Sequence, residues 1–141
     1  MKYREPITQK NPFGCGIACT AFVLGLSYSK TLNLFENGKY KANKSGFYCK
    51  EIVNVLGCEE FSYKYVKDRI KNKIYKDYSI VFIKRSKKYP AGHYLCRYKN
   101  KWMDPWINFL KDQNIKNAKS GFRKRLPGKP IYVIFLNKKI P

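Results

Sequence analysis

Length, composition and charge limit what this chain can be. At 141 residues, 44% of them hydrophobic and 16% aromatic, it can bury one core, so we expect a single domain over residues 1–141. The N-terminus has no apolar signal region, and the longest mostly apolar run, Ile17 to Leu26, is too short to span a bilayer. We therefore expect a soluble protein with no membrane span.

The formal net charge of +21 allows two explanations. It could bind a polyanion, such as nucleic acid or an acidic partner protein. However, lysine outnumbers arginine 24 to 6 and is spread along the whole chain, and Asn, Ile, Tyr and Phe are also abundant. All these residues have A/T-rich codons, whereas phosphate recognition favours clustered arginine. Compositional drift in an A/T-rich genome is the simpler explanation, and a functional basic surface is the alternative.

The first part of the chain is expected to be helical. Residues 1–14 are coil interrupted by proline and glycine, and Gly16 to Leu26 is an apolar run typical of a buried helix. A second helix is expected from Ser29 to Phe35, ended by Asn37-Gly38. A third is expected from a cap at Ser45 to Leu56, closed by Gly57.

The second part is expected to form mainly strands. Phe61–Tyr65 alternates like a strand, and Val66–Tyr75 repeats apolar residues every four positions, which predicts an amphipathic helix. Further strands are expected over Tyr78–Ile83, Gly92–Tyr98, Lys101–Met103 and Ile131–Leu136. Lys111–Gly128 is polar and basic, and its pattern predicts no element. Helices followed by antiparallel strands indicate an α+β fold.

Cys15 lies between Gly14 and Gly16 at the start of the first expected helix. A thiol with a pKa near 8.5 is mostly protonated at neutral pH, and unpaired N–H groups at a helix start favour the thiolate. The flanking glycines leave room for a substrate carbonyl. A small buried hydrophobic residue is the alternative interpretation, and it is the one we adopt for the other four cysteines: Cys19, Cys49, Cys58 and Cys96. An odd cysteine count argues against a disulfide framework and for a reducing, cytoplasmic location.

His93 is the only histidine, and Asp104 directly follows the next expected strand. If Lys99 and Asn100 form a two-residue hairpin loop, Tyr98 lies opposite Lys101. His93 and Asp104 then lie diagonally on one face, within reach of an imidazole–carboxylate hydrogen bond. A three-residue loop would place them on opposite faces. The geometry is permitted, and a structural histidine is the alternative.

Gln9 lies six positions before Cys15 in a bent loop. Its carboxamide could fold back and donate to an oxyanion together with the backbone N–H of Cys15. An exposed polar loop residue is the alternative. With one histidine and no C-x-x-C pair, we expect no metal site and no cofactor.

Together these motifs resemble the bacteriocin-processing peptidases of the papain-like group, in particular their stand-alone members. The resemblance rests on Gln9, on Gly14-Cys15-Gly16, on Gly92-His93 and on Asp104-Pro105-Trp106. It implies a papain-like fold, with a helical lobe that carries the cysteine and a sheet that carries histidine and acid. It also implies Cys15 as nucleophile, His93 as base and acid, Asp104 as orienting acid, Gln9 as oxyanion donor, and a peptide or protein substrate.

The chain departs from the family at two places. The residue before the cysteine is often Asp in the family and is Gly14 here, and the proline that often follows the cysteine is absent from Ile17-Ala18-Cys19. Specificity for double-glycine leader peptides is therefore an open point. An amidase, deamidase or acyltransferase would use the same triad. A polyanion-binding module on a catalytically idle papain-like fold is the alternative from a different class.

Overall fold

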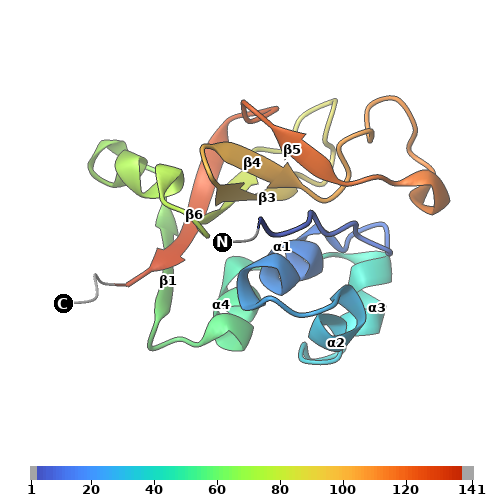
Figure 1. Cartoon of the computed structure of the whole chain (residues 1–141), viewed down its shortest axis with the longest axis horizontal. Helices are drawn as coiled ribbons and strands as arrows, with labels where there is room; N and C mark the ends of the chain where they lie inside the picture. Colours follow the sequence, from blue (N-terminus) through green and yellow to red (C-terminus); the bar gives the residue numbers. More distant parts are fainter. Residues whose placement is uncertain (1–2, 138–141) are drawn as a thin grey trace.

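The computed structural model describes residues 3–137, and the side chains of residues 68 and 69 are left out of the description. Four helices gather at one side of a six-stranded sheet (Figure 1). We call residues 3–60 the helical lobe and residues 61–137 the sheet lobe. None of the helices within residues 3–137 is long and apolar enough to cross a bilayer.

The helical lobe contains α1 (Cys15–Leu24), α2 (Tyr28–Leu32), α3 (Gly38–Lys44) and α4 (Cys49–Leu56). Helix α1 ends at Gly25, whose φ of 72° is left-handed and therefore favours glycine. The cap of α2 is Ser27, not the expected Ser29. Helix α4 ends at Gly57 as expected, but it starts at Cys49, later than the expected cap.

Helix α3 was not expected, because Asn37-Gly38 is a common helix-ending pair. Here Asn37 adopts a left-handed φ of 53° and precedes the first turn of α3. Asparagine tolerates this conformation better than most residues. A signal expected to end one helix therefore begins the next.

The sheet lobe has six strands in the order β1-β6-β2-β3-β4-β5, and every neighbouring pair is antiparallel. The strands are β1 (Phe61–Tyr65), β2 (Ile80–Ile83), β3 (His93–Tyr98), β4 (Lys101–Asp104), β5 (Gly121–Arg123) and β6 (Pro130–Leu136). Strand β5 and the 3-10 turn η2 (Ile115–Asn117) lie in the segment for which no element was predicted. The α+β architecture agrees with the prediction.

The segment Val66–Tyr75, predicted as an amphipathic helix, forms the shorter 3-10 helix η1 (Asp68–Tyr75). Ile74 is buried, whereas Val66 and Ile70 are only partly buried against the core. Most helical stability comes from packing an apolar face. Among the described side chains of η1 only Ile74 is fully buried, which gives the segment little of that packing.

The two faces of the sheet bury separate apolar clusters. One cluster joins the helices to the sheet and includes Ile17, Phe22, Tyr94 and Met103. The other covers the opposite face and includes Val81, Leu95, Trp102 and Tyr89. Helix α1 packs on β3, and Gly16 makes this approach possible, because a Cβ there would lie 3.1 Å from a methyl group of Ile52 and 3.4 Å from the Tyr94 ring.

Candidate active site

Cys15 is the first residue of α1, and its side chain is partly exposed. The preceding cap, Gly14, contributes no side-chain hydrogen bond, and the first turn contains no acidic residue. The backbone N–H groups of the first turn of α1 therefore remain available as hydrogen-bond donors, as expected at a helix start. The backbone N–H of Tyr94 also donates to the Cys15 sulfur at 3.4 Å. These N–H groups surround the sulfur with hydrogen-bond donors.

Gly14 is needed because another side chain occupies the space beside it. A Cβ at this position would overlap with the hydroxyl of Tyr28. That hydroxyl donates to Oδ1 of Asn11 at 2.8 Å, which ties α2 to the loop in front of the cysteine.

The hairpin of β3 and β4 brings His93 and Asp104 together. Lys99 and Asn100 form a two-residue turn with φ values of 50° and 67°, typical of a type I′ hairpin. Tyr98 pairs with Lys101, which is the predicted register. His93 Nε2 lies 2.7 Å from Asp104 Oδ1. Nδ1 is then the ring nitrogen that remains for a thiol.

Asp104 is fully buried and has two further partners. Its Oδ1 accepts the backbone N–H of Trp106 at 2.9 Å. Its Oδ2 lies 3.1 Å from Nε of Arg123 on β5, which makes an ion pair without the alignment of a hydrogen bond. Nothing in the sequence pattern predicted this arginine contact, because β5 has only three residues and pairs with β4 across a long loop.

Burial and charge together set the protonation of this pair. Burial lowers the pKa of His93, but Asp104 and the Cys15 thiol outweigh it and raise the pKa from 6.5 to about 10. Burial raises the pKa of Asp104, but His93, the Trp106 amide and Arg123 outweigh it and hold that pKa below its ordinary value. The two residues therefore form an imidazolium–carboxylate pair at neutral pH.

Tyr89 fixes the imidazole from its flat side. Its ring stacks on His93 with a centroid distance of 5.3 Å and an interplanar angle of 18°. Phe109 also stacks on Tyr89, with a centroid distance of 5.4 Å. The Tyr89 hydroxyl is buried without a hydrogen-bond partner among the described residues. This aromatic stack limits rotation of the imidazole and was not foreseen from the sequence.

Gln9 is buried in the loop before α1 rather than exposed. Its backbone N–H donates to the Pro105 carbonyl at 3.2 Å, so the loop is fixed beside the end of β4. Its side-chain Nε2 donates to the carbonyls of Asn11 and Pro12 at 3.0 and 3.2 Å. Donation to an oxyanion would therefore require this amide to give up or share one of these bonds.

The other cysteines divide into two groups. Cys19, Cys49 and Cys96 are buried, and burial raises the pKa of each thiol, as expected for core residues. Cys58 is exposed, so its prediction as a core residue was wrong. It lies just after Gly57, where α4 has ended and the chain turns at the surface. All five thiols are free.

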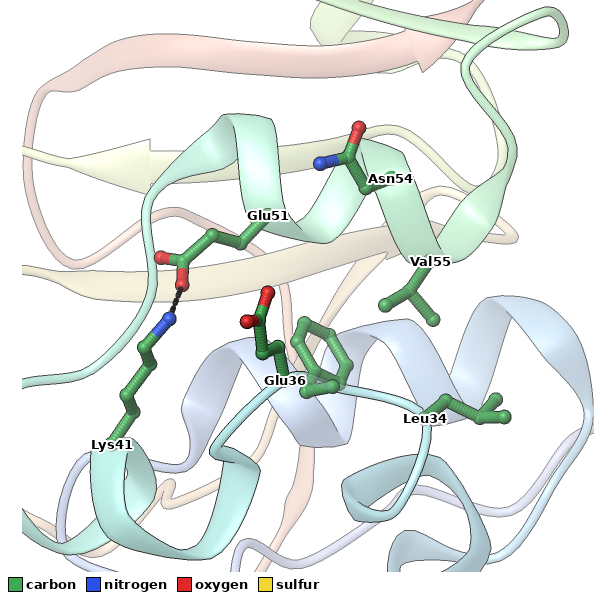
Figure 2. Close-up of a pocket in the computed structure, with 7 residues that line it drawn as sticks. Leu34, Glu36, Lys41, Glu51, Asn54 and Val55 are labelled. Atoms are coloured by element: carbon green, nitrogen blue, oxygen red, sulfur yellow. Dashed lines mark hydrogen bonds and ion pairs between the residues drawn. The ribbon is translucent and has the colours of Figure 1, made fainter.

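A pocket of about 370 Å³ lies on the helical lobe, and none of the four candidate residues lines it. Figure 2 shows the Lys41–Glu51 ion pair within it, with the Glu36 carboxylate nearby. Its lining consists of Leu34, Phe35, Glu36, Lys41, Glu51, Asn54 and Val55. Two of the lining residues are glutamates, and one of them, Glu51, is paired with Lys41.

The fold that positions these residues is the α+β fold of papain-like peptidases. A solved structure with this fold is the peptidase domain of Streptococcus ComA, described as a bi-functional ABC transporter involved in a quorum-sensing pathway. The two share a TM-score of 0.56 and 22% sequence identity over 95% of this chain and 98% of that chain. No protein-family model and no curated protein matches the chain. The likeness confirms the predicted fold.

Proposed function

We propose that this protein is a cysteine peptidase with Cys15 as nucleophile, His93 as base and acid, and Asp104 as orienting acid. The observation that carries the proposal is the buried His93–Asp104 pair, 2.7 Å apart, beside a thiol at a helix start. The fold shared with a peptidase domain supports it. The proposal treats residues 1–141 as one peptidase domain that works in a reducing compartment such as the cytoplasm.

The first chemical step begins from a thiolate–imidazolium pair. In this pair Nδ1 of His93 carries the proton that came from Cys15, while Asp104 holds Nε2 and stabilises the positive charge of the ring. The thiolate attacks the substrate carbonyl and forms a tetrahedral intermediate. The backbone N–H of Cys15, which has no acceptor within its helix, donates to the oxyanion. Gln9 supplies a second donor when its Nε2 turns from one loop carbonyl to the oxyanion.

The second step completes the cycle. His93 gives its proton to the leaving amine, and a thioester to Cys15 remains. Water, deprotonated by His93, hydrolyses this thioester and regenerates the thiol. With another acceptor the same intermediate would give an acyltransferase, and with a side-chain amide as substrate a deamidase. The nature of the acceptor and of the scissile amide separates these activities.

The first experiment compares two cysteine variants on peptide substrates. Peptides with a double-glycine leader are the first to test, because the resemblance implies that class. Cys15→Ala should lose all turnover while keeping the circular dichroism spectrum of the wild type. Cys58→Ala, which removes an exposed thiol, is the matched control and should keep full activity. Turnover by Cys15→Ala would disprove the mechanism.

A further inference from the structure

The positive charge is divided unequally between the two halves of the chain. Residues 1–60 contain eight basic and five acidic side chains, a net charge of +3. Residues 61–141 contain 22 basic and four acidic side chains, a net charge of +18. Drift toward A/T-rich codons would act on both halves alike. It therefore does not explain why nearly all the excess charge belongs to the half that contains the sheet.

Two loops of the sheet lobe concentrate this charge at one place. The β2–β3 loop and the β5–β6 loop lie side by side, because the Lys84 N–H donates to the Lys129 carbonyl at 2.8 Å. A Cβ at Gly128 would also come within 3.1 Å of Ile83. In Figure 1 the β2–β3 loop, in yellow, rises from the sheet on the side away from the helices.

We call the exposed cations of these two loops the basic rim. Its members are Lys84, Arg85, Lys87, Lys88, Lys124, Arg125 and Lys129. Within the described part of the chain, none of them forms an ion pair with a carboxylate. Clustered like charges repel one another. Binding of an anion relieves this repulsion and therefore stabilises the rim.

Both loops of the basic rim are attached to the candidate active site. In the β2–β3 loop, Tyr89 follows Lys88 directly and stacks on His93 at 5.3 Å. In the β5–β6 loop, Lys124 follows Arg123, whose Nε lies 3.1 Å from Asp104. The rim is therefore held beside the histidine and acid by residues that contact them.

We propose that the basic rim binds an acidic segment of the polypeptide substrate next to the scissile bond. The proposal rests on the proposed peptidase function and names its substrate class. Each exposed ion pair contributes little alone, about 0.2–1 kcal/mol, so selectivity requires several carboxylates at once. Because such pairs are screened by salt, binding should weaken as ionic strength rises.

Nucleic acid is the less suitable ligand for this surface. Proteins that bind single strands combine a basic groove with exposed aromatic rings on which bases stack. Among the described residues of the two loops no large apolar side chain is exposed, and Tyr89 is buried against His93. Five of the seven rim cations are lysines, whereas arginine is the usual choice for phosphate.

The binding experiment uses Cys15→Ala, which cannot turn over its ligand. Three fluorescent probes are compared by anisotropy at low salt: a peptide with six glutamates, its glutamine counterpart, and a single-stranded DNA of equal charge. The triple variant Arg85→Gln/Lys87→Gln/Lys88→Gln reduces the rim. Lys39→Gln/Lys44→Gln/Lys50→Gln removes the same charge from exposed positions on the helical lobe.

We expect the glutamate peptide to bind at least about tenfold more tightly than the glutamine peptide, equivalent to about 1.4 kcal/mol. The rim variant should lose this preference, and the helical-lobe variant should keep it. Equal losses in both triple variants would overturn the proposal, because binding would then follow net charge and not the rim. Tighter binding of DNA at the rim would overturn it in favour of a nucleic-acid site.

A cleavage experiment separates this inference from the proposed function. The wild type is incubated with a proteome-derived peptide library, and Cys15-dependent cleavage sites are read by mass spectrometry. We expect acidic residues enriched on one side of the cleaved bonds, and less enrichment with the rim variant. Cleavage without acidic enrichment would overturn the inference alone. Absence of any Cys15-dependent cleavage would overturn the proposed function, and the substrate proposal with it.

Discussion

The helical lobe and the sheet lobe hold their parts of the candidate site by different physical means. In the helical lobe, Cys15 is partly exposed, and its position follows from the start of one helix. In the sheet lobe, His93 and Asp104 are buried ions whose positions depend on strand register and on each other. The thiol should therefore be removable at little cost to folding, whereas the buried carboxylate should not.

The largest expected effect comes from breaking the buried pair. Asp104→Ala leaves His93 and Arg123 without their counter-ion and the Trp106 N–H without its acceptor. We expect the free energy of unfolding to fall by about 3–5 kcal/mol, measured by urea denaturation. Glu59→Ala, at an exposed position, is the control and should not change it measurably. If Asp104→Ala were as stable as the wild type, the His93–Asp104 pair would not stabilise the fold.

A smaller loss of stability is expected from a substitution at Gly14, which is tightly packed against Tyr28 just before Cys15. Gly14→Ala places a methyl group against the Tyr28 hydroxyl, so the free energy of unfolding should fall by about 1–3 kcal/mol. Adding Tyr28→Phe removes the overlapping oxygen and should recover part of this loss. If the effects of the two substitutions on the free energy of unfolding were instead additive, the overlap with the Tyr28 hydroxyl would not be the cause of the loss in Gly14→Ala.

The protonation of the pair gives the third prediction. The raised pKa of His93 stabilises the fold below pH 6.5, and this contribution is lost as pH rises toward about 10. The lowered pKa of Asp104 stabilises it above the ordinary carboxyl value, and this contribution is lost in acid. The pair should therefore stabilise the fold most between the ordinary carboxyl pKa of 3.8 and pH 6.5. Asp104→Asn should abolish the pH dependence of stability that the pair causes.

NMR can observe this titration directly, because the chain has one histidine. The His93 imidazole should remain protonated well above pH 8, and Asp104→Asn should lower its pKa. Arg123→Met removes a neighbouring cation, so it should shift the same pKa upward by a smaller amount. A wild-type imidazole that titrates at 6.5 or below would contradict the ion pair.

The sequence predicted best those features that depend on local signals. The helix start at Cys15 and the two-residue turn at Lys99-Asn100 are encoded within a few residues. The turn fixes the register, and the register fixes which side chains share a face with His93. The α+β fold followed from the order of these elements, and the structure confirms it.

The features that were missed depend on contacts between distant segments. Arg123 reaches Asp104 only because a three-residue strand pairs with β4, and Tyr89 reaches His93 through the packing of a loop. Cys58 lies at the surface because the chain turns there, between the end of α4 at Leu56 and the start of β1 at Phe61. The hydrogen bonds of the buried Gln9 amide likewise depend on the fold of its own loop.

The most direct test of the central claim compares two thiols in the same molecule. Wild-type protein is treated with limiting iodoacetamide at pH 6, and the modified cysteines are identified by mass spectrometry. If His93 holds Cys15 as a thiolate, the partly buried Cys15 should react before the exposed Cys58, and His93→Ala should reverse this order. If Cys58 reacts first in the wild type, Cys15 is an ordinary thiol and the proposed peptidase mechanism is wrong.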